Sequence, residues 1–531
     1  MNNIPIEIIN IILEYDETLK IPITSLSKLL YSFRKSLSIN LNYLKINSFT
    51  TDFQIDTLYN VSDLPLPKID KNIRKIKFDE YFNQKLDELS LNENESRTLF
   101  GSLNLTHLTF GDSFNQILEV LPKEITHLTF GSNFNQKVDN LSKNVTASCT
   151  LTHLTLGYYF NQKIDDLPIN ITHLTLGYYF DKDIDKLPIN LTHLILGRLF
   201  NKKVDNLPKN LTCLSFGTEF NQTIDNLPIN ITQLTFGWNF NQKIENLPKN
   251  MTHLIFGNDF NNEIDYLPKN ITHLTFGRKF NQNIDNLPKK LIYLMFRDKF
   301  NQKVDNLPKK LMYLTFGDDF NQNVDNLPKN IKYLTFGDDF NQNVDNLPES
   351  ITHLTLGNNF NPNVDNLPNL TYTDNFNRNA DNLPKSITHL TFGDDFNQNV
   401  DNLPENIIQL VFGYNFNKNV DNLPKQITHL TLGCKFNQNV DNLPKSITYL
   451  FFGDDFNQNI DNLPKNITHL TFGNNFNQKI DNLPKSITNL ILERNYNKKI
   501  DELSENIIHL TLHIKYNFLI IKYPFIKYEF L

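Results

Sequence analysis

The stretch Ile331-Lys332-Tyr333-Leu334-Thr335-Phe336-Gly337-Asp338-Asp339-Phe340-Asn341-Gln342-Asn343-Val344-Asp345-Asn346-Leu347-Pro348 is one copy of a unit that fills most of this 531-residue chain. Its Phe-Asn pair returns every twenty residues from Phe160 to Phe360, interrupted only where Asp181 follows Phe180. After a shorter step to Phe376 the same spacing continues to Tyr496. A fixed period of this length indicates a solenoid, in which each unit contacts only its neighbours.

Each unit carries six apolar positions that one unit alone is too small to enclose. In one copy these are Ile171, Leu174, Leu176, Phe180, Ile184 and Leu187. Residues 172–176 alternate polar and apolar side chains, which predicts a strand, and stacked units then form a parallel sheet with turns ~4.8 Å apart. The predicted fold class is mainly β: a right-handed parallel β-solenoid of about twenty turns, preceded by a small α-helical module.

Four irregular stretches interrupt the period. Twelve extra residues fall after Leu89 and six after Leu141, and both insertions are expected to loop out at a corner without disturbing the stack. Residues 50–68 show no pattern, although the preceding residues 41–46 fit a degenerate first turn. Between Phe360 and Phe376 four residues are missing, yet Leu370 and Tyr372 fill the two strand positions, so a surviving strand with a local kink is expected.

The spacing I-x-x-L-x-L, followed by a Phe and then by Leu-Pro, resembles the leucine-rich repeat. The phrase F-N-x-x-I/V with Leu-Pro resembles the FNIP repeat more closely, a family familiar from giant DNA viruses and social amoebae; the resemblance covers roughly residues 69–513. In leucine-rich repeats the residues flanking the two strand leucines face the concave surface. The resemblance therefore implies that His173, Thr175 and their counterparts lie on an open face.

The opening Ile4-Pro5-Ile6-Glu7-Ile8 and the following apolar residues do not repeat. Proline and an acidic residue here suit the start of a helix. The stretch resembles the first helix of an F-box, although the Cys and Trp of the later F-box signature are absent. That resemblance implies docking of a Skp-family protein through Ile4, Pro5, Ile8, Ile12 and Leu13, as in SCF-type ubiquitin ligases. The alternative is a plain helical cap over the first turn.

These patterns predict three parts: a helical F-box-like module and cap at residues 1–60, a repeat solenoid at 61–513 and a C-terminal cap at 514–531. The net charge of −7 argues against binding to nucleic acid, and the final apolar stretch is too short and too interrupted to span a membrane. Three scattered cysteines favour a reducing compartment. We therefore expect a monomer in the cytoplasm, or in the host cytoplasm if the chain is viral.

Three rows of polar residues repeat along the array. Twelve of the thirteen histidines share one position, where Tyr, Gln, Asn and Cys replace them elsewhere; stacked, threonine-bonded rings are therefore favoured over a metal site. The Asp before Asn-Leu-Pro, as at Asp285, is expected to accept backbone N–H bonds in a turn rather than to bind calcium. The Asn after each Phe, as at Asn321, is expected to form an amide ladder.

No single constellation of nucleophile, base and phosphate loop stands apart from the repeats, so we predict no enzyme and no cofactor. The function indicated is protein–protein interaction: an SCF-type substrate adaptor, or alternatively a scaffold with no link to ubiquitin. The client is expected on the open strand face, and Phe320, Phe340 and Phe396 are expected inside the core. The client-binding residues proposed from the sequence are His273, Thr275, Tyr293, Tyr313, Thr315 and Tyr333.

Overall fold

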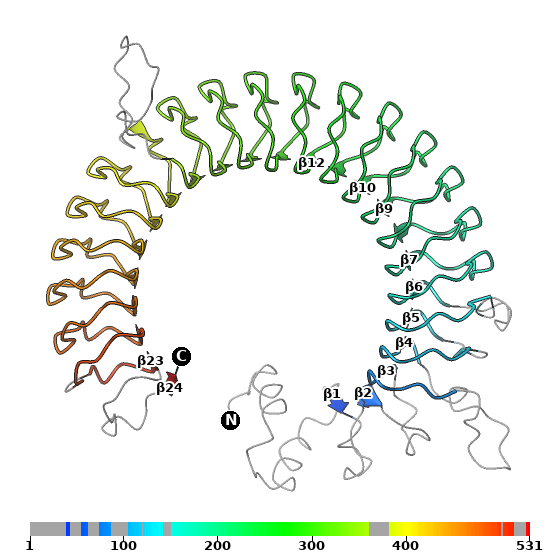
Figure 1. Ribbon diagram of the computed structural model, residues 1–531, viewed down its shortest axis with the longest axis horizontal. Helices are drawn as coiled ribbons and strands as arrows, with labels where there is room; N and C mark the ends of the chain where they lie inside the picture. Colours follow the sequence, from blue (N-terminus) through cyan, green and yellow to red (C-terminus); the bar gives the residue numbers. More distant parts are fainter. Residues whose placement is uncertain are drawn as a thin grey trace, which may run out of the picture. The chain divides into compact units, whose positions relative to one another are not determined.

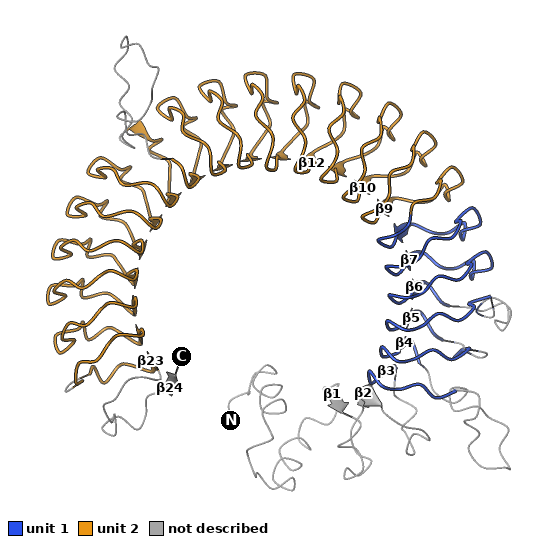
Figure 2. Ribbon diagram, in the orientation of Figure 1, with its two compact units in different colours: residues 1–200 blue, residues 201–531 orange. Residues whose placement is uncertain are grey.

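The structure is a computed structural model. It describes residues 39–42, 55–61, 74–85, 105–118, 121–122, 124–139, 141, 150–360, 382–500, 503–513 and 527–530. The chain divides into two compact units, residues 1–200 and 201–531, which Figure 2 colours blue and orange and which are described separately. Within the described residues, no helix has the length and apolar character needed to cross a membrane.

The described residues of unit 1 form eight strands that pair in chain order (Figure 1). They are β1 (Ile39–Asn42), β2 (Ile55–Val61), β3 (Lys75–Phe78), β4 (His107–Thr109), β5 (His127–Thr129), β6 (His153–Thr155), β7 (His173–Thr175) and β8 (His193–Ile195). Every pairing is parallel, as expected when each strand is followed by a complete turn of a solenoid.

Unit 2 continues the same pattern with sixteen strands, β9–β24. They are β9 (Cys213–Ser215), β10 (Gln233–Thr235), β11 (His253–Ile255), β12 (His273–Thr275), β13 (Tyr293–Met295), β14 (Tyr313–Thr315), β15 (Tyr333–Thr335), β16 (His353–Thr355), β17 (His389–Thr391), β18 (Gln409–Val411), β19 (His429–Thr431), β20 (Tyr449–Phe451), β21 (His469–Phe472), β22 (Asn489–Leu492), β23 (His509–Leu512) and β24 (Lys527–Phe530). The predicted parallel β-solenoid is confirmed, with about 19 turns.

The core is a set of apolar rows that run from turn to turn. Phe320 is 0 % exposed; its ring lies 6.1 Å from the rings of both Phe300 and Phe340, and 3.7 Å from that of Phe316 in its own turn. Phe340 and Phe396 are also 0 % exposed, so the predicted internal spine is confirmed. Parallel rings at these separations pack closely against one another in the core.

The exit from each strand depends on a close approach between neighbouring turns. A Cβ atom placed on Gly177 would overlap the carbonyl oxygen of Gly157 in the turn before it. Glycine therefore allows two backbones to approach more closely than a side chain permits. This is the structural reason for the glycine that follows the strand in most units.

The insertions leave the sheet intact, as predicted. β3 pairs with β4 by aligning Lys75 with His107, and β5 pairs with β6 by aligning His127 with His153. The additional residues in both places therefore do not shift the register in which the strands pair. Insertions at a corner are tolerated because the strands on either side keep all of their hydrogen bonds.

The two units on either side of the shortened one are in direct contact. β16 pairs directly with β17, His353 aligning with His389, and Phe360 stacks on Phe396 with ring centroids 6.4 Å apart. The strand and the kink expected around Leu370 and Tyr372 fall on residues 361–381, outside the described residues, so both stay predictions. The neighbouring complete units supply the whole register, so the sheet does not need the short one.

The ends of the sheet extend beyond the expected array. β2 lies inside residues 50–68, where the sequence suggested irregular structure, and pairs with β3 around a register shift. Its strand was missed because it departs from the spacing of the other units. β24 lies in the segment assigned to the C-terminal cap and pairs with β23. The F-box-like residues Ile4, Pro5, Ile8, Ile12 and Leu13 lie outside the described residues.

Candidate functional site

The residues proposed to bind a client lie together on one face of β12–β15. Leu274, Leu294 and Leu314 point into the core, so the residues on either side of them point away from it. His273, Thr275, Tyr293 and Thr315 are partly exposed, and Tyr313 and Tyr333 are each 37 % exposed. The accessibility predicted for these side chains is confirmed, while their role in binding stays a prediction.

The four rings form a continuous row because the strands pair in register. His273 aligns with Tyr293, Tyr293 with Tyr313, and Tyr313 with Tyr333. The ring centroids of Tyr313 and Tyr333 are 4.6 Å apart and stacked, whereas those of Tyr293 and Tyr313 are 6.2 Å apart and tilted. Tyrosine offers a large apolar surface with a polar tip, which is favoured at protein interfaces.

Apolar neighbours that the sequence analysis missed enlarge this face. Ile292 and Met312 occupy the position before the tyrosine, where Thr stands in most units, and Met295 occupies the position after the central leucine. The Tyr293 hydroxyl lies 3.4 Å from the Met295 sulfur. The available signal was the loss of Thr in three consecutive units, at Ile292, Met312 and Lys332, which an analysis confined to the histidine position overlooked.

A second apolar patch lies on the same face at β18–β20. Tyr449 is 42 % exposed and Phe451 is 44 % exposed, and both project from β20. Ile408, which precedes β18, is 40 % exposed, and Val411 within β18 is partly exposed. An exposed Phe on a strand face is unusual, since polar residues occupy this position in most units. The sequence analysis also missed this patch.

The histidine row is a stack of bonded rings. His127 lies 4.1 Å from His107 and 4.1 Å from His153, measured between ring centroids. Its Nδ1 is 2.8 Å from the Thr126 hydroxyl oxygen, a contact that recurs in other units. Burial, and then the neighbouring imidazoles, lowers the pKa of His127 to about 4. The stacked, threonine-bonded arrangement predicted from the sequence is confirmed. Within the described ranges, no group of three His, Cys, Asp or Glu is placed to hold a metal ion.

The amide ladder predicted for the Asn row is also confirmed. The Asn321 backbone N–H donates to Asn301 Oδ1 over 3.0 Å. In turn, Asn321 Oδ1 accepts the Asn341 backbone N–H at 3.0 Å and the Gln342 side-chain amide at 2.9 Å. Asn301 and Asn321 thus each satisfy a backbone donor in the next turn, which the interior of a solenoid requires.

The aspartate row does not form the predicted contact. Asp285 does not rely on backbone N–H donors: its carboxylate accepts the side-chain amides of Asn283 at 2.9 Å and Asn306 at 3.0 Å. The turn bond runs in the opposite direction, from the Asp285 N–H to Asn283 Oδ1 at 2.7 Å. Asn283, two residues earlier, is therefore the acceptor of this turn, and Asp285 supplies the N–H donor. The amides of Asn306 and then Asn283 lower the pKa of Asp285.

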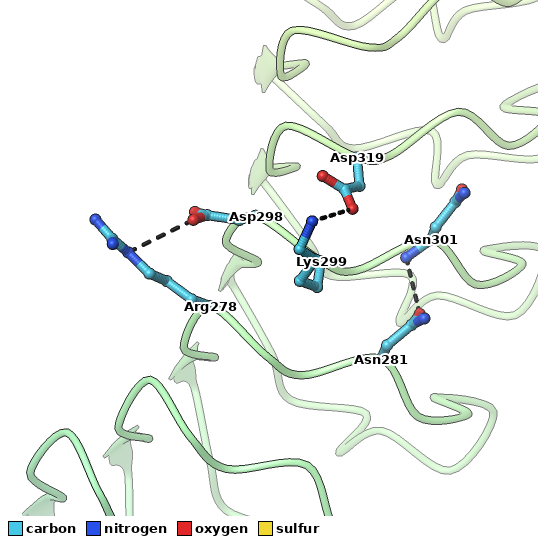
Figure 3. A network of polar contacts seen from close by, with 6 residues as sticks. All are labelled: Arg278, Asn281, Asp298, Lys299, Asn301 and Asp319. Atoms are coloured by element: carbon cyan, nitrogen blue, oxygen red, sulfur yellow. Dashed lines mark hydrogen bonds and ion pairs between the residues drawn. The ribbon is translucent and has the colours of Figure 1, made fainter.

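Charged residues follow the strands of the tyrosine face in two further rows. Figure 3 shows the Arg278–Asp298 pair, the Lys299–Asp319 pair and the Asn281–Asn301 step of the amide ladder as successive rows. The ion-pair distances are 3.5 Å and 2.9 Å. Burial, and then the neighbouring carboxylates led by Asp338, raises the pKa of Asp318. The part of this edge beside β14 and β15 is therefore acidic.

A hollow of about 350 Å³ lies elsewhere on unit 2 and is lined by Asp395, Asn397, Asn415, Asn417 and Lys435. Its polar groups are engaged in the ladders: Asn415 donates to Asp395 over 2.9 Å, and the Asn417 backbone N–H donates to Asn397 Oδ1 over 2.9 Å. We assign it no separate role, because these bonds already belong to the repeat.

Comparison with known proteins places these features in context. The FNIP Repeat family model matches residues 103–142, 160–346 and 376–504 in overlapping copies. The crystal structure of CroV588, a circular leucine-rich-repeat protein from a giant virus, is similar with 39 % identity and a TM-score of 0.68, covering 89 % of this chain and 82 % of that chain. No curated protein matches the chain.

Two bacterial structures show weaker similarity. YopM from Yersinia enterocolitica is 17 % identical with a TM-score of 0.40, covering 95 % of this chain and 99 % of its own. The functional domain of InlJ from Listeria monocytogenes is 13 % identical with a TM-score of 0.42, covering 60 % of this chain and 70 % of its own.

Proposed function

Because this chain belongs to the FNIP repeat family, we propose that it is a non-catalytic interaction protein that binds a protein client on the face of β12–β15. Proteins built from leucine-rich-repeat-like units generally bind protein partners. The observation that carries the proposal is the exposed row of Tyr293, Tyr313 and Tyr333, which faces away from a core that is already complete without it. Exposed apolar patches of this kind mark interaction sites.

The finer form of the proposal is a substrate adaptor of an SCF-type ubiquitin ligase. Its support is the F-box-like opening, in which apolar residues surround nearly the whole helix predicted for residues 4–13. A cap needs only one apolar face, so the excess favours docking of a Skp-family protein. We propose a cytoplasmic monomer with a docking module, a repeat array and a C-terminal cap. The competing function is a scaffold with no ubiquitin link.

Docking is tested with the double variant Ile8→Asp, Leu13→Asp. Purified full-length protein is mixed with a Skp-family protein at micromolar concentrations, and binding is measured by calorimetry. The adaptor role predicts that the unmodified protein binds and that the double variant does not, although its array still melts cooperatively. If the unmodified protein binds no Skp-family partner, the adaptor role is wrong and the scaffold function is favoured.

Client binding is tested separately by affinity capture from cells, with bound proteins quantified by mass spectrometry. Tyr313→Ala should reduce capture of a defined set of proteins. Tyr266→Ala is the matched control, because Tyr266 is 68 % exposed but lies at the corner before Leu267-Pro268 and not on a strand. Equal capture by the two variants would mean that the tyrosine face does not bind the clients.

A further inference from the structure

The tyrosine face of β12–β15 has a basic border on the side where its strands begin. Lysines precede the strands at Lys289, Lys290, Lys309, Lys310 and Lys329, and all five are exposed. The units at Lys289 and Lys309 are the only two in the chain with two consecutive lysines after the Leu-Pro step. Lys290 donates to Asn270 Oδ1 over 2.7 Å, so these side chains extend along the edge of the array.

The opposite border, where the strands end, is mixed in charge beside β12 and β13 and acidic beside β14 and β15. Arg278 and Lys279 follow β12, and Arg297, Asp298 and Lys299 follow β13, whereas only carboxylates follow β14 (Asp318, Asp319) and β15 (Asp338, Asp339). Arg278 pairs with Asp298, and Lys299 pairs with Asp319. Among the described residues, Asp318, Asp338 and Asp339 form no ion pair, although the charge of Asp339 contributes to the raised pKa of Lys299. Since parallel strands in register all run the same way, the lysines collect along one edge of the face and the aspartates along the other.

The dimensions of the face match those of a helix. Each of the four strands contains three residues, which gives a width of ~10 Å at ~3.3 Å per residue. An α-helix with its side chains is ~10–12 Å across. Four strands ~4.8 Å apart extend over ~14 Å, which corresponds to about ten residues of helix. A helix also presents one apolar stripe with two separate polar flanks, whereas one face of a strand has no such flanks.

We propose that this face binds an amphipathic helix laid across β12–β15, with acidic residues on the flank above the lysines and basic residues on the flank above the aspartates. The apolar stripe of that helix covers Tyr293, Met312 and Tyr313. The inference rests on the proposed client binding and specifies the chemistry of the client. Helices that place an apolar face on a hydrophobic surface are a recurring mode of recognition, and complementary charge fixes their register and direction.

The test uses full-length protein and three synthetic helical peptides of equal length. The first carries Glu on one flank of a Leu/Tyr stripe and Lys on the other. The second has the same composition with Glu and Lys mixed on both flanks, and the third replaces the stripe with Ala. The first should bind about tenfold more tightly than the second at low salt, since several weak charge pairs add. This preference should shrink in 1 M salt, where the screening length is ~3 Å, and the third peptide should not bind.

Charge reversal supplies the decisive control. Lys289→Glu, Lys290→Glu, Lys309→Glu and Lys310→Glu together leave Lys329 as the one lysine of that border and make it acidic, while Asp318→Lys, Asp319→Lys, Asp338→Lys and Asp339→Lys together make the other border basic. Each set of changes should abolish the preference for the segregated peptide. All eight changes together restore borders of opposite charge, and the same peptide should bind again with its chain direction reversed. Failure of the eightfold variant to regain the preference would overturn the inference, provided that circular dichroism shows it folded.

Two further outcomes separate the alternatives. Phe451→Ala, which alters the patch on β20, should leave peptide binding unchanged. If this variant loses binding, the peptide binds the β20 patch and not the face of β12–β15, and the inference is wrong. Concentration-dependent dimerisation that disappears on reversing one edge would make a second copy of this chain the occupant instead. If no peptide binds while the Tyr313-dependent capture of clients persists, the helix inference fails and the proposed function stands.

Discussion

Phe320 and Asn321 are adjacent in the chain and stabilise the array by different means. The Phe320 ring fills space between turns, with neighbouring rings 6.1 Å away on both sides. Asn321 connects the same turns through hydrogen bonds to a backbone N–H and a side-chain amide. One residue therefore contributes apolar burial, and the next prevents the buried backbone from being left without an acceptor.

Replacing Phe320 with Ala removes a ring that is 0 % exposed and leaves a cavity between three turns. We expect a loss of about 3–5 kcal/mol in unfolding free energy. Guanidinium titration followed by circular dichroism measures the loss, and hydrogen exchange locates it in the turns around Phe300 and Phe340. Phe320→Leu should cost distinctly less, and a cost equal to that of Ala would argue against a cavity effect.

Asn321→Ala leaves two donors without their acceptor. The expected cost is about 1–3 kcal/mol, because an unsatisfied buried polar group is penalised. Asn321→Asp keeps an oxygen in the same place and should retain most of the stability at neutral pH. Thermal melting of the three proteins side by side checks this order, and equal losses for Ala and Asp would show that the acceptor is unimportant.

At the scale of elements, the strands are short, and most of those described contain three residues. A strand of three residues such as β14 fixes the register of its unit, while the corner tolerates changes in length. The direct pairing of β16 with β17 shows this most clearly, because the paired residues Thr352 and Thr388 are 36 positions apart. The strand pairing is thus independent of the length of chain between the strands.

Deleting residues 361–376 is therefore expected to leave the fold intact. The deletion joins Phe360 to Asn377 and brings His353 and His389 to the regular spacing of twenty. A shorter connection lowers the entropy cost of closure, by roughly half a kcal/mol. The deletion variant should melt at the same temperature as the full chain or slightly above it in a calorimetric scan. A clear fall in melting temperature would mean that the removed residues contribute contacts to the array.

At the scale of the whole molecule, small interactions between neighbouring turns accumulate along a row of identical residues. The histidine row holds five rings in succession in unit 1, at His107, His127, His153, His173 and His193. Lys75 on β3 adds a positive charge near its start, and this charge also contributes to the lowered pKa of His127. Such a row favours neutral imidazoles in the folded state.

The lowered pKa of His127 makes stability depend on pH. The folded protein keeps His127 neutral down to about pH 4, whereas the unfolded chain binds a proton near pH 6.5. Stabilisation is therefore complete above pH 6.5 and is lost as the pH falls towards 4. His127→Tyr removes this titration while keeping a stacking ring, as Tyr293 does in its own unit. Unfolding midpoints should fall less for this variant between pH 7 and pH 4.5; identical profiles would contradict the prediction.

The regular part of the molecule was predictable because the period alone assigns each residue its environment. Phe320, Asn321 and His127 follow directly from their positions in the unit. The period is uninformative where the sequence departs from it, so β2 and the pairing across residues 361–381 were not foreseen. The partners of Asp285 depend on side-chain reach, which spacing does not define. At the candidate site the tyrosines were found, but Ile292, Met312 and Phe451 were missed because they interrupt rows that are otherwise polar.

The direct contact between β16 and β17 also bears on inheritance. A strand recognises its neighbour only through a local pattern that nearly every copy carries, so a copy that drifts away from the pattern is passed over and the next intact one takes its place. One degenerate copy therefore does not prevent the other copies from pairing, and whole copies can be duplicated or lost with little change in stability. Related chains are free to differ in their number of copies while each remains a working fold.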